Sequence, residues 1–247
     1  MIKLVYCLRR KPDLTLEEFQ DHWLERHSDF GRALPGLRRY VQYHRLANDP
    51  INTALAQAGA SEVTVEPYDG MVAAWFDDAE GFSKAMATDV AAAALEDEKL
   101  FIDHDRSDAV LVDEHVIVEP VGRGPIVLVE CLAKRSDIDR RTFSERWLHH
   151  AHIGRQAHEM GLLAGYIQNH ALVEGDARVS ELAELGVGEE IWDGIVTAYF
   201  HSVVVAKTLF ANPLASEESF EDEKTFIDHS KGLYMMARRH VIKDLVR

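Results

Sequence analysis

The chain has 247 residues and a formal net charge of −15, from 42 acidic and 27 basic side chains. A negative field of that size repels nucleic acid and anionic membrane surfaces, and no Lys- or Arg-rich stripe offsets it, so we expect neither as a partner. Hydrophobic residues make up 47% of the chain, enough for a sizeable core. No apolar run approaches the roughly 20 residues of a membrane-spanning helix. The first apolar stretch precedes its basic residues, the reverse of a secretory signal, which favours the cytoplasm.

The first half of the chain predicts the order strand, helix, strand, strand, helix, strand. Thr15 and Glu18 form a capping box that opens the first helix. Leu16, Phe19, Trp23 and His27 then fall on one stripe of that helix, and Pro35-Gly36 ends it. The expected strands are 2–9, 39–46, 70–76 and 109–118, and a second helical region is expected from Asp78 to about Phe101.

The chain contains an internal duplication, because its segments recur at a displacement of 123 to 126 residues. The matching segments are 2–8 with 126–132, 19–23 with 143–147, 40–44 with 166–170, and 96–104 with 221–229. The sequence therefore predicts one repeat over residues 1–120 and another over 126–247, joined by a linker at 121–125 that carries Gly and Pro.

The βαββαβ order of each repeat is typical of a ferredoxin-like unit, an antiparallel sheet with helices on one face. The other face of such a sheet is bare, and two copies in one chain can cover both bare faces by packing them together. We therefore predict an α+β protein in which two ferredoxin-like repeats pack sheet to sheet as an intramolecular α+β barrel.

Several motifs resemble the EthD domain family of the dimeric α+β barrel superfamily, named after a protein of ethyl tert-butyl ether degradation. The motifs are the opening segment 3–12, Trp23-Leu24-Glu25-Arg26-His27, the segment 34–42, and Phe101-Ile102-Asp103-His104. Relatives in the superfamily include lactone isomerases, polyketide cyclases and dehydratases, cofactor-free oxygenases, haem enzymes and proteins with no assigned activity. The resemblance therefore implies a fold without naming a reaction. The second repeat departs from the motif, since it lacks the Pro-Gly pair and its histidine follows Trp147 at a different spacing.

Repeated histidines are the leading candidates for chemistry, because imidazole moves protons near neutral pH. The candidate catalytic residues are His27, His44, His104, His150, His170 and His229. His115 and His240 also repeat but are expected to belong to the core or its lining. Each candidate has a structural alternative, such as a helix C-terminus for His27 or a polar turn for Asp103-His104. The cluster of His149, His150 and His152 does not have the spacing of a metal site, so no metal is expected.

Alternation along the second strand places Tyr40, Gln42 and His44 on one face and Val41 and Tyr43 on the other. We expect the apolar pair to face the helices and the Tyr/Gln/His row to face the enclosed interior, as a binding surface or as a hydrogen-bonded seam. The expected substrate-binding residues are Tyr40, Gln42, Trp75, Tyr166, Gln168 and Tyr199.

These features favour a cofactor-independent lyase or isomerase, of the dehydratase or cyclase type, that acts on a small apolar cyclic or aromatic compound by histidine acid–base catalysis. No cofactor is expected, since no glycine-rich phosphate loop is present to hold a nucleotide. No nucleophile elbow is present, which argues against covalent catalysis. A non-catalytic ligand-binding or accessory protein, a cofactor-free monooxygenase and a haem protein stay open as alternatives. Pairing of two chains into a homodimer also stays open.

Overall fold

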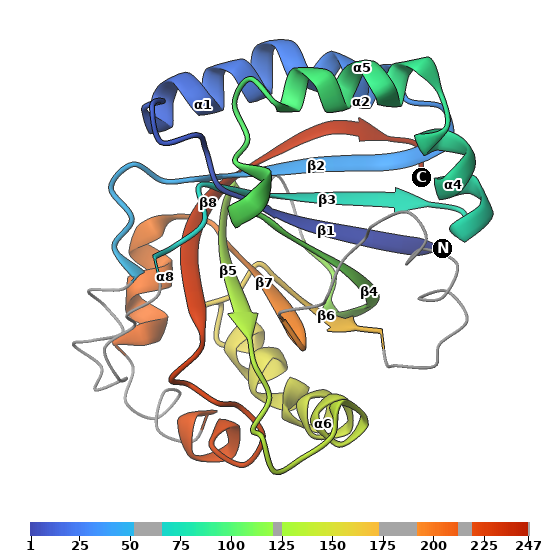
Figure 1. Cartoon of the computed structure of the whole chain (residues 1–247). Coiled ribbons are helices and arrows are strands. Elements are labelled where there is room, and N and C mark those ends of the chain that lie inside the picture. Colours follow the sequence, from blue (N-terminus) through green and yellow to red (C-terminus); the bar gives the residue numbers. More distant parts are fainter. Residues whose placement is uncertain (52–65, 121–124, 173–191, 212–218, 247) are drawn as a thin grey trace.

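The computed structural model describes residues 1–51, 66–120, 125–172, 192–211 and 219–246, and its eight named strands close into one barrel (Figure 1). The strands are β1 (Ile2–Leu8), β2 (Leu37–Arg45), β3 (Gly70–Phe76), β4 (Asp108–Val118), β5 (Ile126–Leu132), β6 (Gly165–Ala171), β7 (Gly194–Phe200) and β8 (Leu233–Asp244). The order around the barrel is β1-β3-β2-β8-β5-β7-β6-β4, and every neighbouring pair is antiparallel.

Each repeat contributes four strands, and the two sheets join through β2 with β8 and β4 with β6. The prediction of an α+β fold with two ferredoxin-like repeats in one intramolecular barrel is therefore confirmed. The linker expected at 121–125 lies outside the described residues except for Pro125.

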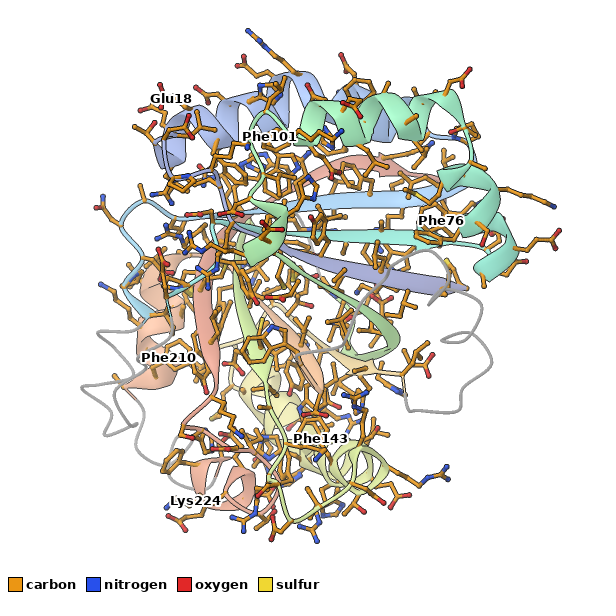
Figure 2. The ribbon with its side chains drawn as sticks, viewed as in Figure 1. Glu18, Phe76, Phe101, Phe143, Phe210 and Lys224 are labelled. Atoms are coloured by element: carbon orange, nitrogen blue, oxygen red, sulfur yellow. The ribbon has the colours of Figure 1, made fainter. Side chains whose placement is uncertain are left out.

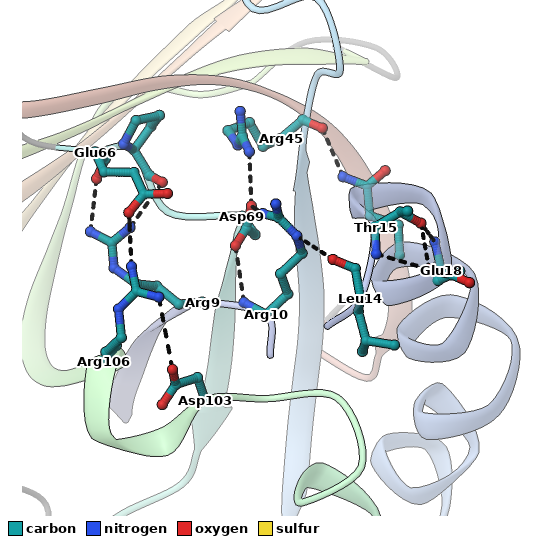
Figure 3. Close-up of polar contacts among 12 residues, drawn as sticks. Arg9, Arg10, Leu14, Thr15, Glu18, Arg45, Glu66, Asp69, Asp103 and Arg106 are labelled. Carbon is teal, nitrogen blue, oxygen red and sulfur yellow. Dashed lines mark hydrogen bonds and ion pairs between the residues drawn. The ribbon is translucent and has the colours of Figure 1, made fainter. Parts of the chain in front are cut away.

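Helices cover the outer face of each sheet (Figure 1). They are α1 (Leu16–His22), the π-helix η1 (Trp23–His27), α2 (Ser28–Ala33), α4 (Ala79–Met86), α5 (Asp89–Glu98), the 3₁₀ turn η2 (His104–Arg106), α6 (Arg140–Glu159) and α8 (Val203–Phe210). The capping box is present, since Thr15 Oγ1 accepts from the Glu18 amide and Glu18 accepts from the Thr15 amide (Figure 3). Among the described residues, no helix has the length and apolarity to span a membrane.

The second helical region is two helices rather than one. Thr88 interrupts it, because its side chain accepts a hydrogen bond from the Ala91 amide and so caps a new helix, α5. This break turns the acidic end of α5 back over the sheet beside α1 and α2 (Figure 1).

Buried side chains form three layers, one inside the barrel and one between each sheet and its helices. Valines 5, 41, 110, 112, 127 and 129 fill much of the barrel interior. Phe101 and Phe143 lie under the helices of the first and second repeat (Figure 2). Glycines in β3 and β7 admit the tryptophan of each repeat, because a Cβ at Gly70 or Gly194 would lie 2.4 or 2.3 Å from the Trp23 or Trp147 ring.

A π-helix compensates for the different histidine spacing of the two repeats. His27 follows Trp23 by four residues, whereas His150 follows Trp147 by three within the regular helix α6. A π-helical segment accommodates one extra residue without rotating the helix beyond it, so both histidines reach the same place. Such bulges often occur at functional sites.

Candidate functional site

The predicted orientation of the Tyr/Gln/His row is wrong. Tyr40, Gln42 and His44 face the helices, whereas Val41 and Tyr43 lie inside the barrel. Tyr166, Gln168 and His170 likewise face α6. Both faces of these strands are buried, so alternation separates the two sets without indicating which set faces the helices.

The row is held against the helices by stacking and hydrogen bonds. Trp23 stacks on His44 with a centroid separation of 4.4 Å, and Trp147 stacks on His170 at 4.3 Å. Gln42 donates to the Trp23 carbonyl at 3.2 Å, and His44 Nε2 donates to the Gln42 side-chain oxygen at 2.9 Å. Gln168 and His170 repeat this arrangement at 2.9 and 3.1 Å.

His44 and His170 are therefore neutral imidazoles, each with its proton on Nε2, where it is donated to the neighbouring glutamine. Burial lowers the pKa of each to about 3, with the neighbouring His240 and His115 adding to the effect. A base with so low a pKa is poorly matched to proton transfer near neutral pH. Their surroundings fit a role in holding helix to sheet better than a role in catalysis.

The other four candidate histidines form two pairs, and each pair lies around one glutamate of its own repeat. In the first repeat, His27 Nδ1 donates to Asp97 at 2.9 Å, and His27 Nε2 and His104 Nε2 lie 3.7 and 3.6 Å from Glu98. The Tyr6 hydroxyl lies 3.1 Å from His104 Nδ1. We call these five residues the first cluster.

The second repeat has the same arrangement. His150 Nδ1 donates to Asp222 at 2.7 Å, and His150 Nε2 and His229 Nε2 lie 3.4 and 3.6 Å from Glu223. Glu130 stands where the first repeat has Tyr6, which completes what we call the second cluster.

The two clusters differ in which polar groups are paired: Glu223 accepts a hydrogen bond from Ser219 Oγ at 2.7 Å, whereas Glu98 accepts none among the described residues. Tyr6 is bonded to His104 in the first cluster. In the part of the chain that the structure describes, the Glu130 carboxyl has no hydrogen-bond or ion-pair partner, and buried His229 Nε2 has no hydrogen bond. Buried polar groups are normally paired, so Glu130 and His229 give the second cluster capacity for a ligand.

Burial also shifts the pKa values of ionisable groups in both clusters. Burial, and then the charge of Asp97, raises the pKa of Glu98 to about 7. Burial, and then the charge of Glu223, raises the pKa of Glu130 to about 8, so Glu130 is protonated at neutral pH. Burial lowers the pKa of His150, but the hydrogen bonds and charges of Glu223 and Asp222 outweigh that effect and the pKa is raised overall.

The remaining predicted residues are distributed between the layers. Trp75 and Tyr199 lie inside the barrel, away from both clusters. Tyr40 and Tyr166 lie in the helix–sheet layers, where Gly31 and Gly154 give their rings room. No three of the described His, Cys, Asp and Glu side chains are arranged to hold one metal ion.

Sequence reasoning overlooked the carboxylates of the clusters. Asp97 and Glu98 recur as Asp222 and Glu223 in the repeated Glu-Asp-Glu-Lys segment, seven residues or fewer before His104 and His229. Acidic residues that recur in both halves beside recurring histidines were the available signal. Glu130 carries no such signal, because its counterpart is a tyrosine.

Comparison with protein families identifies the chain. The EthD domain model matches residues 11–105 and again 135–230, covering most of each repeat. The chain belongs to the EthD domain family. No curated protein matches it in sequence.

Solved structures share the fold of this EthD protein at low identity. One is assigned as a monooxygenase from Lactobacillus acidophilus, with a TM-score of 0.55 and 9% identity over 99% of this chain and 96% of that one. Another is assigned as a chlorite dismutase, with a TM-score of 0.53 and 11% identity over 99% and 96%. An EthD family protein from Bacillus halodurans is 26% identical over 47% of this chain and 99% of its own, with a TM-score of 0.34. The first two likenesses support the barrel fold and leave the reaction open.

Proposed function

We propose that the protein is a cofactor-independent enzyme of the lyase or isomerase type, and that the second cluster is its active site. The substrate is a small, largely apolar cyclic or aromatic compound that carries a carbonyl group. The observation that supports this proposal best is the Glu130 carboxyl, which has no hydrogen-bond or ion-pair partner among the described residues and lies beside Glu223 and two histidines.

Two carboxyl groups in different protonation states supply an acid and a base. Glu130, with its pKa of about 8, holds a proton at neutral pH and donates it to a departing hydroxyl or to a ring carbon. Glu223 accepts the proton next to the substrate carbonyl. His150 and His229 lie against opposite oxygens of Glu223, and His150, whose pKa is raised, stabilises its charge between turnovers.

The proton balance closes without a redox partner. Glu223 gains one proton, Glu130 loses one, and exchange through His150 or solvent restores both groups. General acid–base catalysis of this kind contributes about 10² to 10⁴ in rate for each group. Burial of Glu130 and His150 strengthens these electrostatic effects, while the Glu223 side chain keeps 24% exposure.

The duplication provides a matched control for testing this proposal. Turnover is to be screened on lactones, hydroxyketones and aromatic ketones, after native mass spectrometry of the purified protein for a retained ligand. We expect Glu223→Gln and Glu130→Gln to lose at least 10² in kcat, and Glu98→Gln, the equivalent change in the first cluster, to lose less than tenfold. Equal losses in Glu98→Gln and Glu223→Gln would contradict the assignment to the second repeat.

A non-catalytic binding protein is the second candidate, because unpaired buried groups also suit a carrier. A retained ligand with no turnover of any screened compound would favour it. Oxygen consumption with the ligand, measured by an oxygen electrode, would instead favour the cofactor-free monooxygenase.

A further inference from the structure

One end of the barrel interior, where β1 and β5 begin, carries polar side chains at positions that the duplication makes equivalent. The equivalent pairs are Lys3 with Val127, Trp75 with Tyr199, Glu114 with Arg239, and Asn169 with Tyr43. Sequence divergence has given the two sets opposite properties.

The set around Lys3 satisfies its own polar groups. Lys3, only 4% exposed, pairs with Glu114 and donates to the Asn169 side-chain oxygen at 2.6 Å. Asn169 donates in turn to the Ile195 carbonyl at 2.8 Å, and the Trp75 indole donates to Glu114 at 3.4 Å. Nothing in this set calls for a ligand.

The set around Arg239 has donors in excess. The Arg239 guanidinium lies over the Tyr199 ring, 5.4 Å from its centroid, and its buried Nε has no hydrogen-bond partner among the described residues. The hydroxyls of Tyr43 and Tyr199 lie 3.0 Å apart. Two hydroxyls that share one hydrogen bond leave one O–H free to donate.

The missing acceptor is explained by the duplication. Lys3 is paired by Glu114, but the equivalent of Lys3 is Val127, which pairs with Ala237, so no opposite charge stands at the position equivalent to Lys3 to pair with Arg239. Nearby Arg39 has the Asp244 carboxylate 3.7 Å from its Nε as a counter-charge, although that Nε, like the Nε of Arg239, makes no hydrogen bond among the described residues. Lys3, Arg39 and Arg239 therefore bring three positive charges to this end of the barrel, and Glu114 and Asp244 bring two negative charges. Among the described residues, one positive charge is left uncompensated.

We propose that Arg239 and the Tyr43–Tyr199 hydroxyl pair bind the carboxylate of a small monoanionic ligand with an apolar body. The guanidinium supplies charge and N–H donors, and the free phenol hydrogen supplies a further donor to the same carboxylate. The apolar side chains beside this set, Val127 and its strand neighbours Ala237 and Tyr199, are almost fully buried, so binding requires them to repack around the apolar body of the ligand. This site is separate from the second cluster, which lies on the other face of the sheet, and it does not depend on the proposed reaction.

Isothermal titration calorimetry with benzoate tests the proposal, and benzamide serves as the uncharged analogue. We expect benzoate to bind with one-to-one stoichiometry and benzamide to bind at least tenfold more weakly. Arg239→Gln should weaken benzoate binding at least tenfold, and Tyr199→Phe should weaken it severalfold. Arg238→Gln, an exposed neighbour on the opposite strand face, should leave the affinity within twofold.

Competing explanations give different results. Benzoate binding that Glu223→Gln abolishes and Arg239→Gln leaves intact would place the anion at the second cluster and overturn this site. Failure of the wild-type protein to bind benzoate at millimolar concentration, or equal affinity for benzoate and benzamide, would also overturn it. Should Arg239→Gln fail to fold, the affinity of Tyr199→Phe for benzoate and the ratio of the wild-type affinities for benzoate and benzamide still test the site.

Discussion

Glu130→Gln should make the protein more stable at alkaline pH, because it removes a carboxyl group that the fold forces to stay protonated. The pKa of Glu130 is about 8 in the folded protein against an ordinary value of 4.5. At pH values between these two, the unfolded chain has released this proton and the folded chain has not. The free energy of unfolding therefore falls as pH rises from about 4.5 to about 8 and then levels off.

The size of this effect follows from the pKa difference. Each pH unit corresponds to about 1.4 kcal/mol, so the difference of about 3.5 units between the folded and ordinary values amounts to about 5 kcal/mol. Glutamine resembles a protonated carboxyl group in shape. We expect Glu130→Gln to match the wild type near pH 4.5 and to exceed its stability by about 5 kcal/mol near pH 9.

Urea unfolding followed by circular dichroism, at half-unit steps from pH 4.5 to 9, measures this difference. Glu145→Gln, on the exposed side of α6, is the matched control and should give a difference that does not change with pH. A Glu130→Gln difference that is flat across the same range would mean that Glu130 ionises without penalty, and it would refute the reasoning for a buried acid.

Three further predictions concern the Trp-to-His spacing, the His150–Asp222 ion pair and the glycine beside Trp23. Deleting Glu25 should leave the melting temperature within a few degrees of the wild type, because the deletion gives the π-helical segment the same Trp-to-His spacing as α6. Deleting His149 from α6 should lower the melting temperature strongly, since it turns His150 away from the buried face of the helix. Asp222→Asn should lower the pKa of His150, measured by NMR titration of its ring proton, and an unchanged value would contradict the ion pair. Gly70→Ala should cost about 1–3 kcal/mol in urea unfolding because its methyl group meets the Trp23 ring, and a neutral result would show that the ring has room to move.

The fold was predictable because the duplication and the strand–helix order constrain each other. Repeated segments such as 2–8 and 126–132 define two units, and a ferredoxin-like unit leaves one sheet face to be covered. Closure of the barrel goes further, because the edge strands of the two sheets also pair, β2 with β8 and β4 with β6.

The facing of β2 was not predictable from alternation. Val41 and Tyr43 have the apolar character expected of the helix-covered side, yet they fill the barrel, while His44 stacks on Trp23 outside it. Local sequence carries the period of a strand, but which face meets the helices depends on contacts with residues distant in the chain, such as Gly70 and Trp23.

The clusters were predictable in part. Four of the six candidate histidines meet around Glu98 and Glu223, but the sequence did not indicate that they would lie together. The π-helix that aligns His27 with His150 has no signature in composition, because it results from one extra residue held in place by tertiary contacts. Glu130 differs between the repeats, so recurrence alone could not identify it.

The position of a bound substrate or product in a crystal structure tests the central claim most directly. The account predicts that a compound turned over by the protein lies between the second sheet and α6, with its oxygen atoms within hydrogen-bond distance of Glu130 and its reacting carbon near Glu223. A substrate found inside the barrel, or against Glu98 in the first repeat, would contradict it.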